Sequence, residues 1–245
     1  MSHKVQNLKF KVSYDGSFYY GSQKQPDQRT VEDELLRAFG RLNINTKIIF
    51  SGRTDRDVHA SGQVFNSIIP SHWKDFKKFK EVLNHQLNPS IKILHICKVS
   101  DNFHSRFSAK KRTYRYLLTT KETTPFNQNY ITSVKNINEA LIKKAIKEFV
   151  GVHDFKYFHK TGSDKEITTR EIFDVDFYAY KDVYVIKFVA SSYLRSQIRM
   201  MVGSLLAISN GKLTIDQLRE QLNLKKEHFR TPASANGLYL AKITY

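Results

Sequence analysis

Cysteine is almost absent from this chain of 245 residues, and long apolar runs are missing altogether. The single Cys97 excludes an internal disulfide and leaves no cysteine pair to begin a zinc site. Nine histidines are scattered without the spacing of a zinc-dependent hydrolase or deaminase. No run of about 18 apolar residues predicts a membrane span, and residues 1–4 lack the apolar core of a signal peptide. These absences favour a cytoplasmic protein that uses no metal.

Glycine and acidic residues are also scarce. The 10 glycines include no Gly-x-Gly-x-x-Gly loop, which argues against a cofactor-dependent RNA methyltransferase. Against 23 Asp and Glu stand 40 Lys and Arg, a net charge of +17 that favours a polyanionic partner. Membrane headgroups and nucleic acid both qualify. The missing membrane segments favour nucleic acid, and the even spread of basic residues indicates a charged face on a folded body.

Hydrophobic periodicity predicts an α+β protein with two mixed subdomains, residues 1–104 and 105–245. Thr30 and Asp33 have the spacing of a capping box, which predicts that a helix begins at residue 31. We expect helices at 31–43, 76–87, 141–149 and 192–209, and strands at 8–14, 47–51, 63–69, 91–99, 112–119, 170–180, 183–190 and 238–245.

A charged segment at 51–63 follows one of the predicted strands and is the first candidate for chemistry. It contains Arg53, Asp55, Arg56, Asp57 and His59 within seven positions. Loops at strand ends carry catalytic groups more often than other segments do. The alternative is an ordinary turn in which Asp55 caps a short helix and the arginines face solvent.

Several separated motifs along the chain match one known family together. The first is the segment 52–55, which reads Gly-Arg-Thr-Asp. The others are 14–16, 30–32, 58–60, 62–64, 103–109, 114–116, 151–155, 199–203 and 237–240. In this order the motifs resemble the tRNA pseudouridine synthase A family, with 52–55 resembling its catalytic loop, and the resemblance covers nearly the whole chain.

This resemblance implies a pseudouridine synthase fold, two α/β subdomains with antiparallel sheets flanking a basic cleft, assembled as a homodimer. It also implies that the substrates are uridines in the anticodon arm of tRNA, at positions 38 to 40, and that no cofactor is needed. Asp55 matches the family's nucleophile, Tyr114 the tyrosine that stacks on the target base, and Arg199 the arginine that pairs with the nucleophile. Arg53 matches an arginine that opens and binds the RNA stem.

The chemistry of pseudouridine formation suits these residue types. The bond from ribose to the uracil nitrogen breaks, the base turns, and a bond to carbon forms, so the reaction consumes no water and no redox partner. A carboxylate can attack either the sugar or the base, and both paths stay open. A guanidinium such as that of Arg199 would keep Asp55 ionised, and stacking on Tyr114 would offset the cost of extruding the base.

Several of these residues also have a purely structural interpretation. Arg199 and Arg195 stand four apart and could share the polar face of one helix. Tyr114 alternates with its neighbours on a predicted strand and could be a core tyrosine. His59, His104 and Arg106 are candidate RNA contacts, although a lone histidine on a loop is more often a surface residue. A non-catalytic RNA-binding protein would explain the charge, but it gives Asp55 no task.

Two positions depart from the family pattern. Asp57 stands where the family has glycine, and Ser22 stands where it has tryptophan, between Gly21 and Gln23. If the backbone at residue 57 has a positive φ, aspartate tolerates it better than most residues. A second carboxylate so close could raise the pKa of Asp55. We predict that the Asp57 side chain points away from Asp55.

Overall fold

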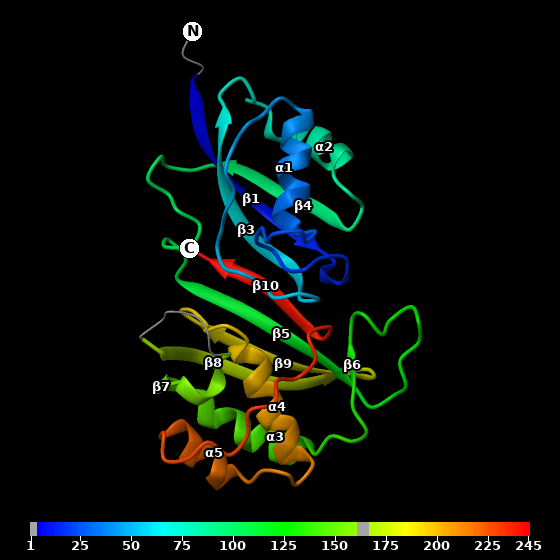
Figure 1. The fold of residues 1–245 in the computed structure, drawn as a ribbon, viewed down its shortest axis with the longest axis vertical. Coiled ribbons are helices and arrows are strands. Elements are labelled where there is room, and N and C mark those ends of the chain that lie inside the picture. Colours follow the sequence, from blue (N-terminus) through cyan, green and yellow to red (C-terminus); the bar gives the residue numbers. More distant parts are fainter. Residues whose placement is uncertain (1–3, 161–166) are drawn as a thin grey trace. The chain divides into compact units, whose positions relative to one another are not determined.

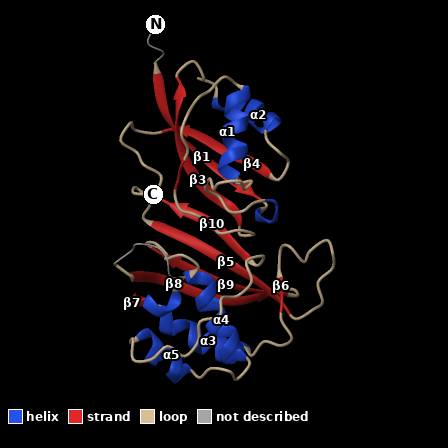
Figure 2. Cartoon of the chain, in the orientation of Figure 1, coloured by secondary structure: helices blue, strands red, loops and turns tan. Residues whose placement is uncertain are grey.

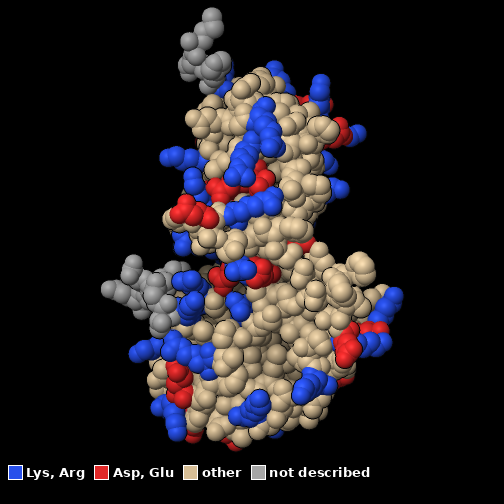
Figure 3. Space-filling model, turned by 45° about the vertical axis from the view of Figure 1, so that its right-hand side comes forward, with Lys and Arg blue, Asp and Glu red and all other residues tan. Residues whose placement is uncertain are grey.

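A computed structural model describes residues 4–160 and 167–245. The chain forms two compact units, one made of Met1–Lys110 with Leu240–Tyr245 and the other of Lys111–Tyr239. Helices and strands occur in both units (Figure 2), which confirms the predicted α+β class. Lys and Arg side chains are spread over the visible face of both units (Figure 3). Among the described residues, no helix combines the length and apolar character needed to cross a membrane.

The first unit is built on antiparallel strands in the order β4–β1–β3 (Figure 1). These strands are β1 (Val5–Tyr14), β3 (His59–Pro70) and β4 (Ile91–Lys98), and the short β2 (Ile49–Phe50) pairs with β3. The final strand β10 (Leu238–Thr244) begins in the second unit and runs beside β3 in the first. Burial alternates along β1 because one face of the sheet carries the core.

Helices α1 (Val31–Arg41) and α2 (Phe76–Gln86) cover that face, and aromatic rings fill the space beneath them. Phe10 of β1 stacks on Phe65 of β3 at 4.6 Å between ring centroids. Phe39 of α1 and Phe79 of α2 meet Phe10 edge-on, at 5.7 and 6.2 Å. All four rings are fully buried, so this cluster fixes both helices on the sheet that carries the candidate loop.

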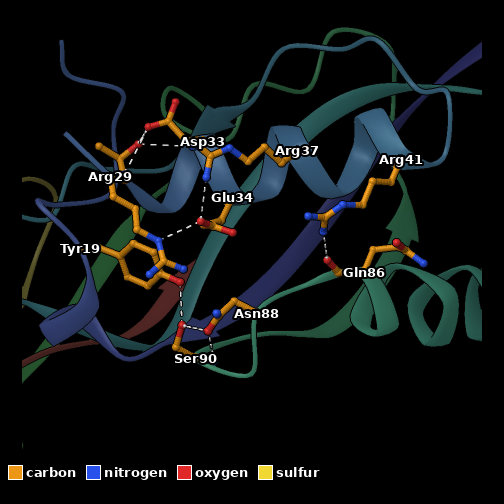
Figure 4. A network of polar contacts seen from close by, with 10 residues as sticks. Tyr19, Arg29, Asp33, Glu34, Arg37, Arg41, Gln86, Asn88 and Ser90 are labelled. Atoms are coloured by element: carbon orange, nitrogen blue, oxygen red, sulfur yellow. Dashed lines mark hydrogen bonds and ion pairs between the residues drawn. The ribbon is translucent and has the colours of Figure 1, made fainter. Parts of the chain in front are cut away.

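The helix α1 starts where the capping box predicts. The Thr30 hydroxyl accepts the Asp33 N–H, and the Asp33 carboxylate accepts the Thr30 N–H. Ion pairs continue along the outer side of the helix (Figure 4), where Glu34 accepts from Arg29 at 2.8 Å and from Arg37 at 3.1 Å. These pairs are partly exposed, so each contributes little to stability.

The second unit has the strand order β5–β9–β8–β7, again antiparallel. A short β6 (Thr132–Ser133) adds a parallel pair to β5. The other strands are β5 (Lys111–Thr119), β7 (Gly151–Asp154), β8 (Thr169–Tyr180) and β9 (Val183–Ala190). The helices are α3 (Glu139–Ala145), α4 (Gln197–Ser209) and α5 (Ile215–Leu222), and the short 3-10 turns of the chain are η1 (Gly16–Phe18), η2 (Ile146–Phe149) and η3 (Lys156–Phe158). As predicted, Lys181 and Asp182 form the turn between β8 and β9, with φ of 52° at Lys181.

Several predicted bounds were wrong. β3 begins at His59 because its pairing with β1 continues to Ala60 opposite Tyr14, so the candidate loop ends at residue 58 and not at 63. The predicted strand 47–51 contracts to β2. α4 begins at Gln197 and not at residue 192, since Ser196 has a left-handed backbone with φ of 60°. Strand β7 and helix α5 were not predicted at all.

Candidate active site

Asp55 lies in the first unit, on the loop 51–58 that joins β2 to β3. The side chain is half-buried, and its backbone carbonyl accepts the Val58 N–H at 3.2 Å to close a tight turn. The turn residue Asp57 has a left-handed backbone, with φ of 63°, which fits the glycine of the family pattern. No helix follows Asp55, so the alternative in which it caps one is wrong.

The backbone immediately before Asp55 is held by two hydrogen bonds to Ser22. The Ser22 hydroxyl accepts the Thr54 N–H at 2.9 Å, and the Ser22 N–H donates to the Thr54 carbonyl at 3.1 Å. Gly21 permits this close approach, because a Cβ there would lie 2.7 Å from the Thr54 carbonyl oxygen and its φ is 102°. Ser22 is fully buried, so water cannot replace its hydroxyl as the acceptor.

A cluster of buried polar side chains supports the loop from behind; we call it the support cluster. Its members are Tyr14, Ser22, Ser51, Thr54 and Gln63. The Tyr14 hydroxyl bonds Thr54 Oγ1 at 2.8 Å. Ser51 Oγ donates to Gln63 Oε1 at 2.6 Å, and Gln63 Nε2 donates to the Gly52 carbonyl at 2.9 Å. Burial raises the pKa of Tyr14 to about 12, against the opposing effect of its hydrogen bonds to Thr54, Gln63 and Ser22. The cluster therefore holds uncharged groups beneath the loop at neutral pH.

His59, a candidate RNA contact, is also buried. Its Nδ1 accepts the Gly16 N–H at 3.0 Å and lies 3.3 Å from Asp15 Oδ1. Since Nδ1 is an acceptor from Gly16, the ring proton belongs on Nε2 and the approach of Asp15 is no ion pair in this tautomer. A Cβ on Gly16 would lie 2.1 Å from the Val58 carbonyl oxygen, so the loop and this turn are in close backbone contact.

Basic side chains of the loop reach the surface. Arg53 is exposed. Arg56 is exposed too, and its guanidinium lies 4.4 Å from the centre of the Tyr20 ring and 3.4 Å from the Asp57 carboxylate. The half-buried Asp55 thus stands in sequence between two exposed arginines, Arg53 and Arg56.

Tyr114 lies in the second unit, on β5, where the predicted alternation is confirmed. Arg112, Tyr114 and Tyr116 are buried, while Thr113 is half-buried and Arg115 exposed. The Tyr114 ring meets Tyr193 edge-to-face at 5.2 Å between centroids. Burial, followed by the nearby Tyr114, holds the pKa of Tyr193 well above its ordinary value, while Arg112 opposes the shift. The phenols of Tyr114 and Tyr193 and the guanidinium of Arg112 therefore lie near one another on this side of β5.

Arg199, also in the second unit, lies in the first turn of α4. Its Nε donates to the Ala233 carbonyl at 2.7 Å, and the Ala233 N–H donates to the Arg199 carbonyl at 2.8 Å. Arg195 precedes the helix, so the interpretation of a shared polar helix face is wrong. Arg199 lies close enough to Tyr116, on the strand of Tyr114, to affect its pKa. Burial raises the pKa of Tyr116 to about 12, and the hydrogen bond to Thr132 and the charge of Arg199 oppose that rise.

His104 and Arg106 lie together in the first unit, on the segment after β4. His104 Nδ1 accepts the N–H groups of Arg106 and Phe107 at 3.2 and 3.3 Å. The His104 ring is half-buried and Arg106 is exposed. Within the described ranges, no three His, Cys, Asp or Glu side chains are grouped to hold a metal ion.

The matched motifs contain Tyr14 and Gln63 without a role for either, and Ser22 was noted only as a departure from the family pattern. The structure shows all three behind the loop of Asp55. A signal was present for Tyr14 and Gln63, because both are polar residues within apolar strand patterns.

Comparison with known proteins decides the family. A family model described as tRNA pseudouridine synthase matches residues 11–108 and 145–245. The chain belongs to the tRNA pseudouridine synthase family. Among its relatives, a tRNA pseudouridine synthase A of Wolinella succinogenes is 38% identical over 96% of this chain and 92% of the relative. One of Helicobacter hepaticus is 38% identical over 96% of this chain and 97% of the relative, and one of Streptococcus agalactiae is 38% identical over 97% and 94%.

Membership in the tRNA pseudouridine synthase family confirms three predictions from the sequence: the resemblance, the enzyme class and the isomerisation of uridine in tRNA. Residues 52–55, which carry the resemblance at the loop, lie inside the matched range 11–108. Arg199 lies inside the second matched range, and Tyr114 lies between the two.

Proposed function

We propose that this synthase modifies uridines of the anticodon arm, positions 38 to 40, with Asp55 as the nucleophile. The single observation that carries the assignment of Asp55 is the pair of hydrogen bonds between Ser22 and Thr54. These bonds fix the backbone immediately before the carboxylate. A nucleophile gains most from such restraint because the reacting atoms must be held close together. The half-burial of Asp55 leaves its carboxylate accessible to an extruded nucleotide.

The reaction is balanced without an added reagent. The bond between the sugar carbon and the uracil nitrogen breaks, a bond to the uracil ring carbon forms, and the proton on that carbon leaves while the nitrogen gains one. Asp55 attacks either the sugar or the base and is released unchanged. Neither path requires a metal or a cofactor.

We assign supporting roles to Tyr114 and Arg199 on the family resemblance. The face of β5 around Tyr114 is aromatic, and an aromatic ring can stack on a base taken out of its helix. Arg199 has its Nε held by the Ala233 carbonyl, which orients a guanidinium suited to a carboxylate. In this proposal Arg199 keeps Asp55 charged and Tyr114 holds the target uracil.

Arg53, His104 and Arg106 complete the proposed RNA-binding set, supported by the exposure of both arginines. For His59, burial and its bond from Gly16 favour support of the loop over direct contact with RNA. From the sequence pattern we also propose two subdomains at 1–104 and 105–245 and a cytoplasmic location. A homodimer is proposed on the resemblance alone.

Tritium release tests the proposed chemistry. Transfer RNA labelled at uracil carbon five is incubated with the protein without added cofactor, beside Asp55→Ala and Asp55→Asn. We expect release by the wild type alone, with tRNA binding retained by both variants. Release by Asp55→Asn at the wild-type rate would refute the assignment, and binding without release by the wild type would favour a non-catalytic RNA-binding protein.

A further inference from the structure

An aromatic pair stands on the surface of the first unit, well away in sequence from the loop of Asp55. Phe107 is 76% exposed, and its ring stacks on His104 with 4.3 Å between centroids and 29° between planes. The Arg106 guanidinium lies 5.6 Å from the Phe107 ring centre. His104 covers part of the Phe107 ring, and the remaining surface is open to solvent.

The exposure of Phe107 is imposed by a well-bonded backbone. His104 Nδ1 accepts the N–H groups of residues 106 and 107, and the His104 carbonyl accepts the Ser108 N–H at 2.9 Å. The next anchor is the buried Asn66, whose Oδ1 accepts the Ser105 N–H at 2.8 Å. A large apolar side chain fixed outward in this way marks a contact surface more convincingly than one on a loose loop.

A hollow borders this pair. A cavity of about 540 Å³ is lined by 14 residues, which include His104, Phe103, Asn66 and Lys47. Its volume falls within the range of roughly 300–1,000 Å³ found for small-molecule sites. His104 lines the hollow and also stacks on Phe107, so the hollow adjoins the pair on its histidine side.

We propose that the Phe107–His104 pair and the adjoining hollow bind an unpaired nucleotide of the tRNA substrate outside the catalytic loop. The Phe107 ring stacks on the base, and Arg106 contacts a phosphate. This inference rests on the proposed function, because tRNA is the intended ligand. Three observations favour RNA over a protein surface: the ring stack, the flanking guanidinium and the net charge of +17. Base–aromatic stacking is sequence-tolerant, so the site would add affinity and little specificity.

Two substitutions at Phe107 separate stacking from general hydrophobic contact. Phe107→Leu keeps an apolar side chain without a ring, and Phe107→Trp keeps a ring. By filter binding, we expect Phe107→Leu to weaken tRNA affinity about 5-fold to 150-fold, which corresponds to roughly 1–3 kcal/mol. Phe107→Trp should bind like the wild type. The matched control is Phe126→Leu, since Phe126 is 90% exposed; it should leave affinity unchanged.

Salt dependence tests the part of Arg106. Arg106→Gln should reduce the slope of log affinity against log salt by about one, and Phe107→Leu should leave that slope unchanged. Equal affinities for the wild type and Phe107→Leu would overturn the proposal. So would a change from dimer to monomer in Phe107→Leu during sedimentation, because the pair would then contact a second copy of the chain.

The failure of this inference and the failure of the proposed function are distinguishable. Tritium release by the wild type at saturating tRNA reports the reaction, whereas filter binding of Phe107→Leu reports the binding surface. If the wild type releases tritium and Phe107→Leu binds tRNA with unchanged affinity, only the binding surface is rejected. If the wild type releases no tritium and Phe107→Leu binds tRNA more weakly, only the chemistry is rejected.

Discussion

Replacing Ser22 with alanine removes the acceptor for the Thr54 N–H, one residue before Asp55. Because Ser22 is fully buried, no water takes the place of its hydroxyl. An unsatisfied buried donor costs about 1–3 kcal/mol. In a protein of this size each kcal/mol lowers the melting temperature by roughly 2–4 °C. We therefore expect Ser22→Ala to fold with a melting temperature lowered by several degrees.

The activity of Ser22→Ala should fall by more than its stability implies. The backbone bond from the residue-22 N–H to the Thr54 carbonyl remains, but the Thr54 N–H is released and can turn toward another acceptor, which shifts the backbone that carries Asp55. A misplacement of about 1 Å at a reacting group can reduce the rate about 100-fold. We expect kcat for tritium release to fall at least about 10-fold, equivalent to roughly 1.4 kcal/mol, with KM for tRNA unchanged because Ser22 is not exposed to RNA.

Ser67→Ala is the matched control. Ser67 is also a buried serine of the first unit, and its hydroxyl donates to the Lys47 carbonyl at 2.7 Å and bonds Thr46 Oγ1 at 2.8 Å. Its loss should lower the melting temperature to a similar degree while leaving kcat unchanged. If Ser22→Ala and Ser67→Ala show the same kcat at a temperature where both are folded, the Ser22 bond does not position the nucleophile.

Two further variants test the loop and its support. Asp57→Gly should raise the free energy of unfolding by about 1 kcal/mol, since φ at residue 57 is 63°, and should leave the pH optimum unchanged; higher turnover with an optimum moved to lower pH would show that Asp57 acts on Asp55. Tyr14→Phe should change the pH dependence of urea unfolding. Burial raises the pKa of folded Tyr14 to about 12 from its ordinary value of 10.0, so the unfolded state loses this proton first. Stability therefore falls by about 1.4 kcal/mol per pH unit between pH 10 and 12. In Tyr14→Phe the free energy of unfolding should not show this part of the decline with pH. Identical curves of unfolding free energy against pH for the wild type and the variant would show that the Tyr14 phenol is exposed to water.

Strong periodicity made much of the fold predictable. The capping box of Thr30 and Asp33 located the start of α1, and the alternation along β5 placed Tyr114 on the buried face. The helix α5 carries a comparable signal, a capping box of Thr214 with Gln217, although no helix was predicted there. The late start of α4 had no such signal, because the left-handed backbone of Ser196 depends on tertiary packing.

The sequence predicts Asp55 as a candidate site residue, but it does not predict the support cluster beneath the loop of Asp55. A linear pattern identifies a charged loop, but whether a serine or tyrosine hydroxyl points inward depends on which distant segments meet. Thr54, Tyr14 and Gln63 come from separate parts of the chain and are joined only in the folded unit.

Ser22 shows most clearly how structure changes the meaning of a sequence feature. Tryptophan, the residue in the family pattern, has an indole N–H that donates and no group that accepts. Ser22 supplies an acceptor to the Thr54 N–H, a bond that tryptophan at this position could not form through its side chain. The departure therefore adds a restraint next to Asp55 that a tryptophan side chain could not supply.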